Sequence, residues 1–163
     1  MVQRDYGYNQ PLGLPGGIYD LSLKKIVTRT TDPNVSVKPG MGLVRGASEG
    51  ETVKLPVTGT AADKFEGILV HGSKQLEQTM NGTVATAGSD TVGLMQRGRI
   101  WGLIASTATI AYGKGVALIL SGENVGRFTD ASDGSESQKV ALPDVIFTGR
   151  ADKDNEIAVI EMK

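Results

Sequence analysis

The sequence TVGLMQRGRIWGLIAS (residues 91–106) combines strand-forming apolar residues with three glycines, at positions 93, 98 and 102. Val, Ile and Trp are enriched in strands. Gly is the residue that most readily adopts the backbone conformations of tight turns. We therefore expect this stretch to form a β-hairpin that reverses near Gly98.

The same punctuation runs along the whole chain, which has 22 Gly among 163 residues. Short apolar runs such as FEGILVHG (residues 65–72) and GKGVALILSG (residues 113–122) are interrupted and ended by glycines. Gly and Pro are costly inside helices, by roughly 1 and 3 kcal/mol. The sequence thus predicts an all-β, barrel- or sandwich-like domain of many short antiparallel strands, with at most one or two short helices.

Several segments carry more specific expectations. Residues 115–120 are apolar at every side-chain position and residues 157–162 at all but Glu161, which predicts strands buried on both faces. In residues 18–30, Tyr19, Leu21 and Leu23 alternate with polar residues, and the alternation slips at Lys25–Ile26, which predicts a bulge there.

Turns and helices are also indicated. TDPN (residues 31–34) predicts a turn, and Pro56 favours an edge position for the strand of residues 52–57. Residues 61–65 fit one helical turn, and residues 73–82 are the longest helix candidate, ending in a tight turn at Asn81–Gly82. Residues 128–138 read as a polar loop.

Residues 1–17 show neither helical nor strand periodicity and mix Tyr, Pro, Gly and Asn. We expect them to form an arm on a single β-rich domain of residues 18–163. A frayed terminus without a partner is the alternative interpretation. The arm residues that would contact a partner are Tyr6, Tyr8, Pro11, Leu12 and Leu14.

Composition limits the classes of partner. The formal net charge is −1, which argues against nucleic acid as a partner. The chain has no Cys, which excludes disulfides and thiolate-bound zinc. No apolar run reaches the roughly 18 residues of a membrane span, and the N-terminus lacks the apolar core of a signal peptide. We expect a protein made in a cytoplasm, without a membrane or small-molecule partner.

Catalytic motifs are weak. GASEG (residues 46–50) matches the G-x-S-x-G pattern with Ser48 as nucleophile, but no helix follows it. The only histidine, His71, is expected to be structural, and we assign no catalytic residue, cofactor or metal ligand. Trp101, with Arg97 and Arg99 nearby, is either a core residue or the anchor of an interface.

The order of several segments resembles the cement, or decoration, proteins of tailed-bacteriophage capsids. The matching segments are QPLGLPGGIYD, KKIVTRT, VKPGMGLVRG, KFEGILVHGSKQLEQ, TVGLMQRGRIWGLI, AYGKGVALILSGENVGRFTDA and NEIAVIEMK. The resemblance implies a non-enzymatic β domain on the outside of a virion capsid, with the major capsid protein as its partner. It also implies a homotrimer at three-fold positions. Besides the arm, Arg97, Arg99 and Trp101 are then candidate contacts with the capsid.

The main alternative is a carbohydrate- or receptor-binding β module of a phage or bacterial surface structure. Such a module would expose a cluster of aromatic side chains. Only 5% of the residues are aromatic, and several of them lie in the arm. A hydrolase that uses Ser48 and His71 is a third possibility.

Overall fold

The computed structural model describes residues 12–72, 77–78, 84–86, 88–133 and 138–163. In this part of the chain the fold is all-β, as predicted, and the only helical element is the 3-10 turn η1 (Ala62–Lys64). The strands are β1 (Lys25–Thr31), β2 (Gly42–Arg45), β3 (Thr52–Lys54), β4 (Phe65–Leu69), β5 (Glu77–Gln78), β6 (Val84–Ala85), β7 (Thr91–Leu103), β8 (Gly115–Ile119), β9 (Phe128–Asp130), β10 (Lys139–Asp152) and β11 (Ile157–Met162).

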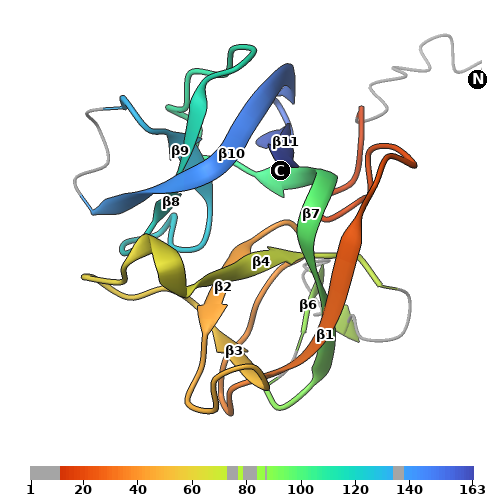
Figure 1. The fold of residues 1–163 in the computed structure, drawn as a ribbon, viewed down its shortest axis with the longest axis vertical. Helices are drawn as coiled ribbons and strands as arrows, with labels where there is room; N and C mark the ends of the chain where they lie inside the picture. The colour runs from red at the N-terminus through yellow and green to blue at the C-terminus, as the bar shows by residue number, and fades with distance from the viewer. Residues whose placement is uncertain (1–11, 73–76, 79–83, 87, 134–137) are drawn as a thin grey trace, which may run out of the picture.

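Five strands close into a small barrel, which forms the lower half of Figure 1. Their order is β1-β3-β2-β4-β7, and β7 pairs back to β1 to complete the circuit. The pairing of β1 with β3 is parallel and short, with Thr30 opposite Thr52 and Thr31 opposite Val53. The barrel is therefore closed at one end of β1, while the rest of that strand pairs only with β7.

Strand β7 is one continuous 13-residue strand, so the prediction of a hairpin at Gly98 is wrong. Gly98 has φ +117°, a backbone conformation that other residues rarely adopt, and it bends the strand instead of reversing it. Before the bend, β7 pairs with β1 and β4; after it, β7 pairs with β11. The strand thus passes out of the barrel into a second group of strands, ordered β11-β10-β8-β9 (Figure 1).

Two strands of this second group are buried on both faces, as predicted. In β8, the four residues Val116 to Ile119 are inaccessible to solvent, and so are the first four residues of β11, Ile157 to Ile160. Strand β11 lies between β7 and β10, and β8 lies between β10 and β9. Each strand is thus paired along both edges, and its successive apolar residues are buried on both faces of the sheet.

The barrel and the second group of strands share a core. One cluster of buried side chains joins Val44, Ile68 and Met95 of the barrel to Phe128 and Phe147 of the other strands. Their contact is close: a Cβ on Gly42 would lie 2.7 Å from both Leu118 and Phe128. The two groups of strands therefore pack directly on each other.

A buried ion-pair cluster joins four of the five barrel strands. Glu66 on β4 is 7% exposed and accepts hydrogen bonds from Arg29 on β1 at 2.7 Å, Arg45 on β2 at 3.3 Å and Gln96 on β7 at 3.1 Å. A buried carboxylate is stable only when it is paired in this way. Sequence reasoning missed the cluster because its members are far apart along the chain.

Several local predictions are confirmed. The register of β1 against β7 shifts between Lys25 and Ile26, where the alternation slips. A turn follows β1 at Pro33–Asn34, and η1 is the expected single helical turn.

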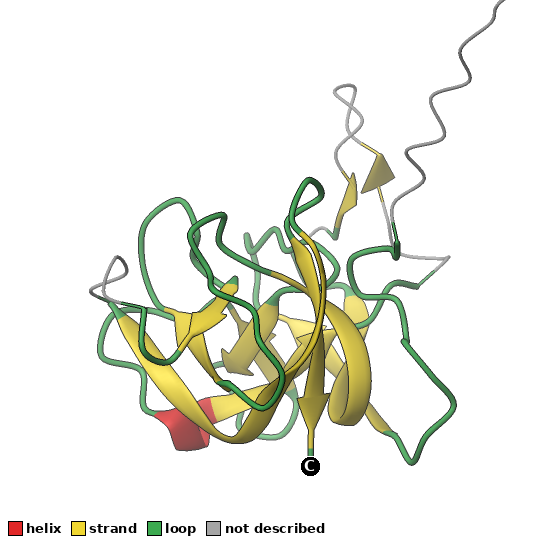
Figure 2. Ribbon diagram, turned by 90° about the horizontal axis from the view of Figure 1, so that it is seen from above, coloured by secondary structure: helices red, strands yellow, loops and turns green. Residues whose placement is uncertain are grey.

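Others are wrong. Residues 77–78 of the expected helix form strand β5, paired with β6 in a two-stranded ribbon that stands apart from the body in Figure 2; Asn81–Gly82 lies outside the described residues. Phe128–Asp130 is a buried strand instead of a loop. Pro56 lies beyond the end of β3, which is an interior strand with β1 and β2 on its two sides. Residues 21–23 form bends before β1 instead of strand.

Replacement of Gly98 by Ala tests the bend. A Cβ at this position would lie 3.1 Å from the Lys24 Cβ, and the alanine would have to keep the positive φ of Gly98. This strained backbone conformation costs a residue other than glycine about 1–3 kcal/mol of stability. Gly93→Ala is the matched control in the same strand, since its Cβ would meet only ordinary contacts at 3.5 Å. Urea unfolding should show a clear loss of stability for Gly98→Ala alone. Equal stability of the two variants would contradict the assigned role of Gly98.

Candidate functional site

The N-terminal segment, residues 12–20, lies along the part of β7 that follows the Gly98 bend. The Gly16 amide donates to the Trp101 carbonyl at 2.7 Å, the Trp101 amide donates to Gly17 at 2.9 Å, and the Tyr19 amide donates to Arg99 at 3.0 Å. Ile18 forms an antiparallel bridge with Ile100. The segment therefore covers the edge of β7 that does not pair with β11.

Trp101 lies beneath this segment and is only 5% exposed. Gly13 lies directly on the indole, because a Cβ at Gly13 would come within 2.3 Å of the ring. The Tyr19 ring packs edge-on against Trp101 at 5.8 Å, and the Arg150 guanidinium lies 5.9 Å from the centre of the Tyr19 ring. Position 13 thus accepts only glycine without displacement of the segment.

Two carboxylates also hold the N-terminal segment. Asp152 accepts the Leu12 amide at 3.1 Å, and Asp20 pairs with Arg99 at 3.1 Å. The pKa of Asp152 is lowered by hydrogen bonds from the Asn155 side chain and then from the Leu12 amide. The pKa of Asp20 is lowered by hydrogen bonds from Ser22 and, more weakly, by Arg99. Both groups therefore favour the attached segment in their ionised form.

Exposed apolar side chains are concentrated just here. Of nine large apolar side chains that are exposed in the described residues, seven lie between residues 12 and 26. We call these seven the apolar strip: Leu12, Leu14, Ile18, Tyr19, Leu21, Leu23 and Ile26. Leu21 is 91% exposed and Leu23 is 83% exposed. Exposed apolar residues scattered along a chain are ordinary, but seven of them within one short segment point to an interaction surface.

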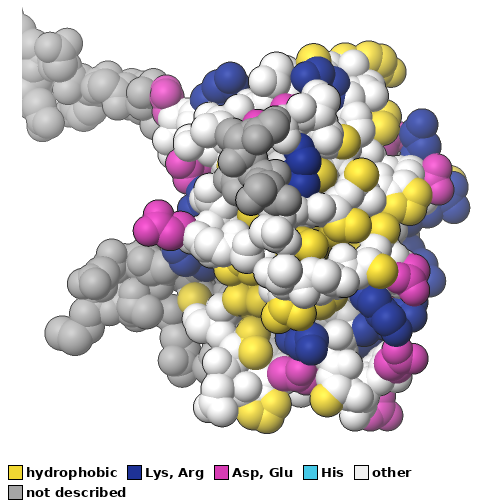
Figure 3. All heavy atoms as spheres, turned by 90° about the vertical axis from the view of Figure 1, so that its left-hand side faces the viewer, with side chains coloured by type: hydrophobic (Ala, Val, Ile, Leu, Met, Phe, Trp, Pro, Cys, Tyr) yellow, Lys and Arg dark blue, Asp and Glu magenta, His cyan; other side chains and the backbone are white. Residues whose placement is uncertain are grey.

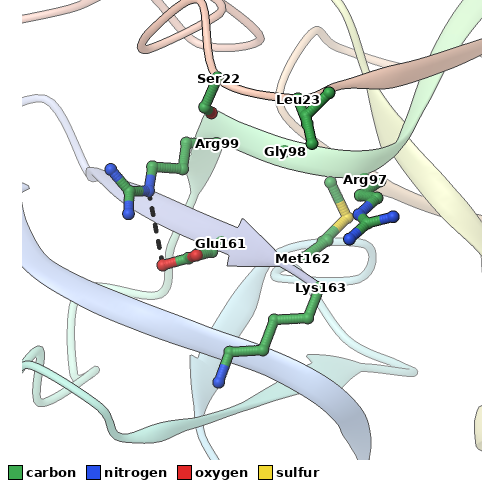
Figure 4. Close-up of a pocket in the computed structure, with 8 residues that line it drawn as sticks. All are labelled: Ser22, Leu23, Arg97, Gly98, Arg99, Glu161, Met162 and Lys163. Carbon is green, nitrogen blue, oxygen red and sulfur yellow. Dashed lines mark ion pairs between the residues drawn. The ribbon is translucent and has the colours of Figure 1, made fainter.

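A pocket of about 420 Å³ opens next to the strip, at the bend of β7 (Figure 4). Leu23 and Met162 supply apolar wall, and Arg97 and Lys163 supply cationic groups. Arg99 also lines the pocket, but its guanidinium is paired with Glu161 at 3.4 Å as well as with Asp20. The pocket therefore has positive charge available from Arg97 and Lys163.

The opposite side of the molecule has a different surface. Figure 3 shows the face on the left of Figure 1, where apolar atoms appear between polar ones across the middle and Lys and Arg gather mainly along the right-hand margin. A second pocket, of about 340 Å³, is lined by the loops around β2, β3 and η1. Its cations include Arg45 and Lys64, which pair with Glu66 and Glu49.

The residues predicted to contact a partner differ in how exposed they are in the structure, and three of them lie outside the described part of the chain. Tyr6, Tyr8 and Pro11 lie outside the described residues. Leu12 and Leu14 are exposed members of the apolar strip, and Arg97 and Arg99 line the pocket at the bend. Trp101 is covered by the N-terminal segment, so it offers no exposed anchor in this conformation.

Sequence reasoning missed Leu21, Leu23 and Ile26 as surface residues. The alternation of Leu21 and Leu23 with polar residues predicts a strand here, and it does not show whether the apolar face is buried. The signal that pointed the other way was the density of polar residues around them, in the run SLKK (residues 22–25).

Ser48 and His71 do not form a catalytic pair. Strands β2 and β4 are antiparallel, with Val44 opposite Phe65 and Gly42 opposite Ile68. Ser48 follows β2 at the Phe65 end of this pair, whereas His71 follows β4 at the other end. In addition, no group of three or more potential metal ligands occurs among the described residues. No helix in this part of the chain is long and apolar enough to span a membrane.

Gly13→Val tests how the N-terminal segment is held. The added side chain would overlap the indole, so we expect the segment to lift away while the barrel remains folded. Trp101 fluorescence should shift to the red and become more accessible to a quencher, with little change in far-UV circular dichroism. Leu14→Ala is the control, because Leu14 is exposed and its truncation should leave Trp101 covered.

Acid should release the same segment. The pKa values of Asp20 and Asp152 lie below their ordinary value in the folded chain, so their contribution is present above about pH 4. It is lost as the pH falls through the lowered folded pKa values. We expect Trp101 emission to shift at low pH before the circular dichroism signal is lost, and Asp152→Asn to weaken this step. A single transition shared by both signals would contradict it.

Comparison with known proteins assigns the chain to a family. The family model described as "Structural cement protein (E217 gp24/Pam3 gp6)" matches residues 2–163. A chain in the solved structure "The capsid of Myoviridae Phage XM1" has the same fold, with a TM-score of 0.72 and 12% identity over 92% of this chain and 89% of that chain. No curated protein gives a significant match. The chain therefore belongs to the structural cement protein family of bacteriophage capsids.

Proposed function

We propose that this protein is a non-enzymatic decoration protein that binds the outer surface of the major capsid protein shell and stabilises the mature head. The observation that carries the proposal is the apolar strip, which gathers seven exposed side chains in one short segment of the described chain. Membership of the cement family supports a structural role in the capsid. The fold shared with a chain of a phage capsid structure agrees with this role.

The N-terminal residues supply further contacts in this proposal. Tyr6, Tyr8 and Pro11 extend the surface that Leu12 and Leu14 begin. Their attachment point is fixed, because the segment that follows them is hydrogen-bonded to β7. A homotrimer would present three such surfaces to the shell, and linked contacts give avidity even when each is weak.

The glycan-binding alternative has less support. Among the described aromatic side chains, only Tyr19 and Tyr112 are exposed. Tyr19 is packed between Trp101 and Arg150, whereas Tyr112 is 83% exposed. Two exposed aromatic side chains are fewer than the cluster that such a module would present.

Deletion of residues 1–11 tests the part of the arm that precedes the N-terminal segment. The deletion keeps the N-terminal segment, so Trp101 should remain covered and the unfolding midpoint should be unchanged. Occupancy on expanded, undecorated shells, measured by co-sedimentation, should fall because arm contacts are lost. The intact chain should also raise the temperature at which those shells break.

Each result has a clear meaning. If the deletion variant occupies shells as well as the intact chain does, residues 1–11 are not part of the contact. If the intact chain binds no shell under any condition of maturation, the proposed function is wrong. Light scattering of the free chain tests the homotrimer independently.

A further inference from the structure

The open part of strand β1 is a second feature of the surface that carries the apolar strip. Residues 25–30 pair with β7 on one side, but on the other side only Thr30 and Thr31 pair with β3. Within the described chain, residues 25–29 therefore have one unpaired main-chain edge. An open edge of this kind is a template for another strand.

The hydrogen bonds at the end of β1 show which groups face outward. The Thr31 amide donates to Asp90, on the β7 side, and the Thr30 amide donates to Glu51, on the β3 side. Because main-chain groups alternate along a strand, Thr28 and Ile26 also point away from β7. The Arg29 guanidinium, which donates to the Thr28 carbonyl at 2.9 Å, lies on this outer side.

Charge indicates what this edge can accept. Lys24, Lys25, Arg97 and Lys163 lie at its start, and in the described chain none of them forms an ion pair with a carboxylate. Lys25 is opposite Arg97 in the register, beside the pocket at the bend. Like charges oppose the pairing of this edge with the same edge of a second copy. They favour a strand that carries carboxylates.

We propose that the β1 edge accepts an extended, acidic segment of the shell protein as an added strand. The main-chain groups of Ile26 and the Thr28 amide bind the segment, a carboxylate binds at Arg97 in the pocket, and Leu21 and Leu23 cover its apolar residues; the Thr28 carbonyl keeps its bond from Arg29. Strand addition of this kind takes affinity from main-chain hydrogen bonds and specificity from side-chain pockets. The inference rests on the proposed binding to the shell and identifies the surface and the chemistry of its partner.

The test compares two charge reversals on expanded, undecorated shells. Arg97→Glu places a carboxylate in the pocket, and we expect it to weaken binding about tenfold or more. Lys54→Glu makes the same change on β3, at the other pocket, and should bind as the intact chain does. Arg97 is exposed, so the fold should persist; covered Trp101 emission in both variants verifies this.

Hydrogen exchange tests the added strand directly, because a contact made by charged side chains alone would not protect the main-chain amides of β1. The amides of Ile26 and Thr28 should exchange quickly in the free protein and slowly on the shell. If the intact chain binds shells but Arg97→Glu binds equally well, or these amides gain no protection, the inference is wrong and shell binding stands. If the intact chain binds no shell, both the inference and the proposed function fail.

Discussion

The fold depends on strand β7, which continues as one strand through the bend at Gly98. Before the bend the strand closes the barrel against β1 and β4, and after it the strand holds β11. The positive φ of Gly98 turns the strand without breaking either ladder. A reversal at this point would separate the two groups of strands, which instead pack on one shared core.

The surface follows from the same constraint. The bend leaves a pocket on its outer side, and the edge of β7 beyond it is covered by the N-terminal segment. That segment covers Trp101 with Gly13 and Tyr19, while its larger apolar side chains remain outside. Leu21 is 91% exposed and Leu23 is 83% exposed, so the chain presents apolar side chains to solvent beside the pocket.

Closure of the barrel brings charged residues from different strands together, and these residues pair with one another. Arg29, Arg45 and Gln96 come from three strands and meet at Glu66 on a fourth. Removal of Glu66 would leave two cations without their shared partner, which is costly in a buried site. The cluster links these four strands through their side chains, in addition to the apolar packing inside the barrel.

The sequence alone determined the all-β class, the doubly buried strands β8 and β11, the bulge at Lys25–Ile26 and the single turn η1. These features are local: each depends on glycine frequency, an apolar run or a break in alternation, and all three can be recognised from residues that are close together in the sequence. The tertiary structure decided whether Gly98 bends or reverses the strand, since glycine permits both and only the pairing with β11 selects one. It likewise decided that Leu21 and Leu23 lie outside and that Trp101 is covered, because alternation shows two faces but not which of them the rest of the chain will bury.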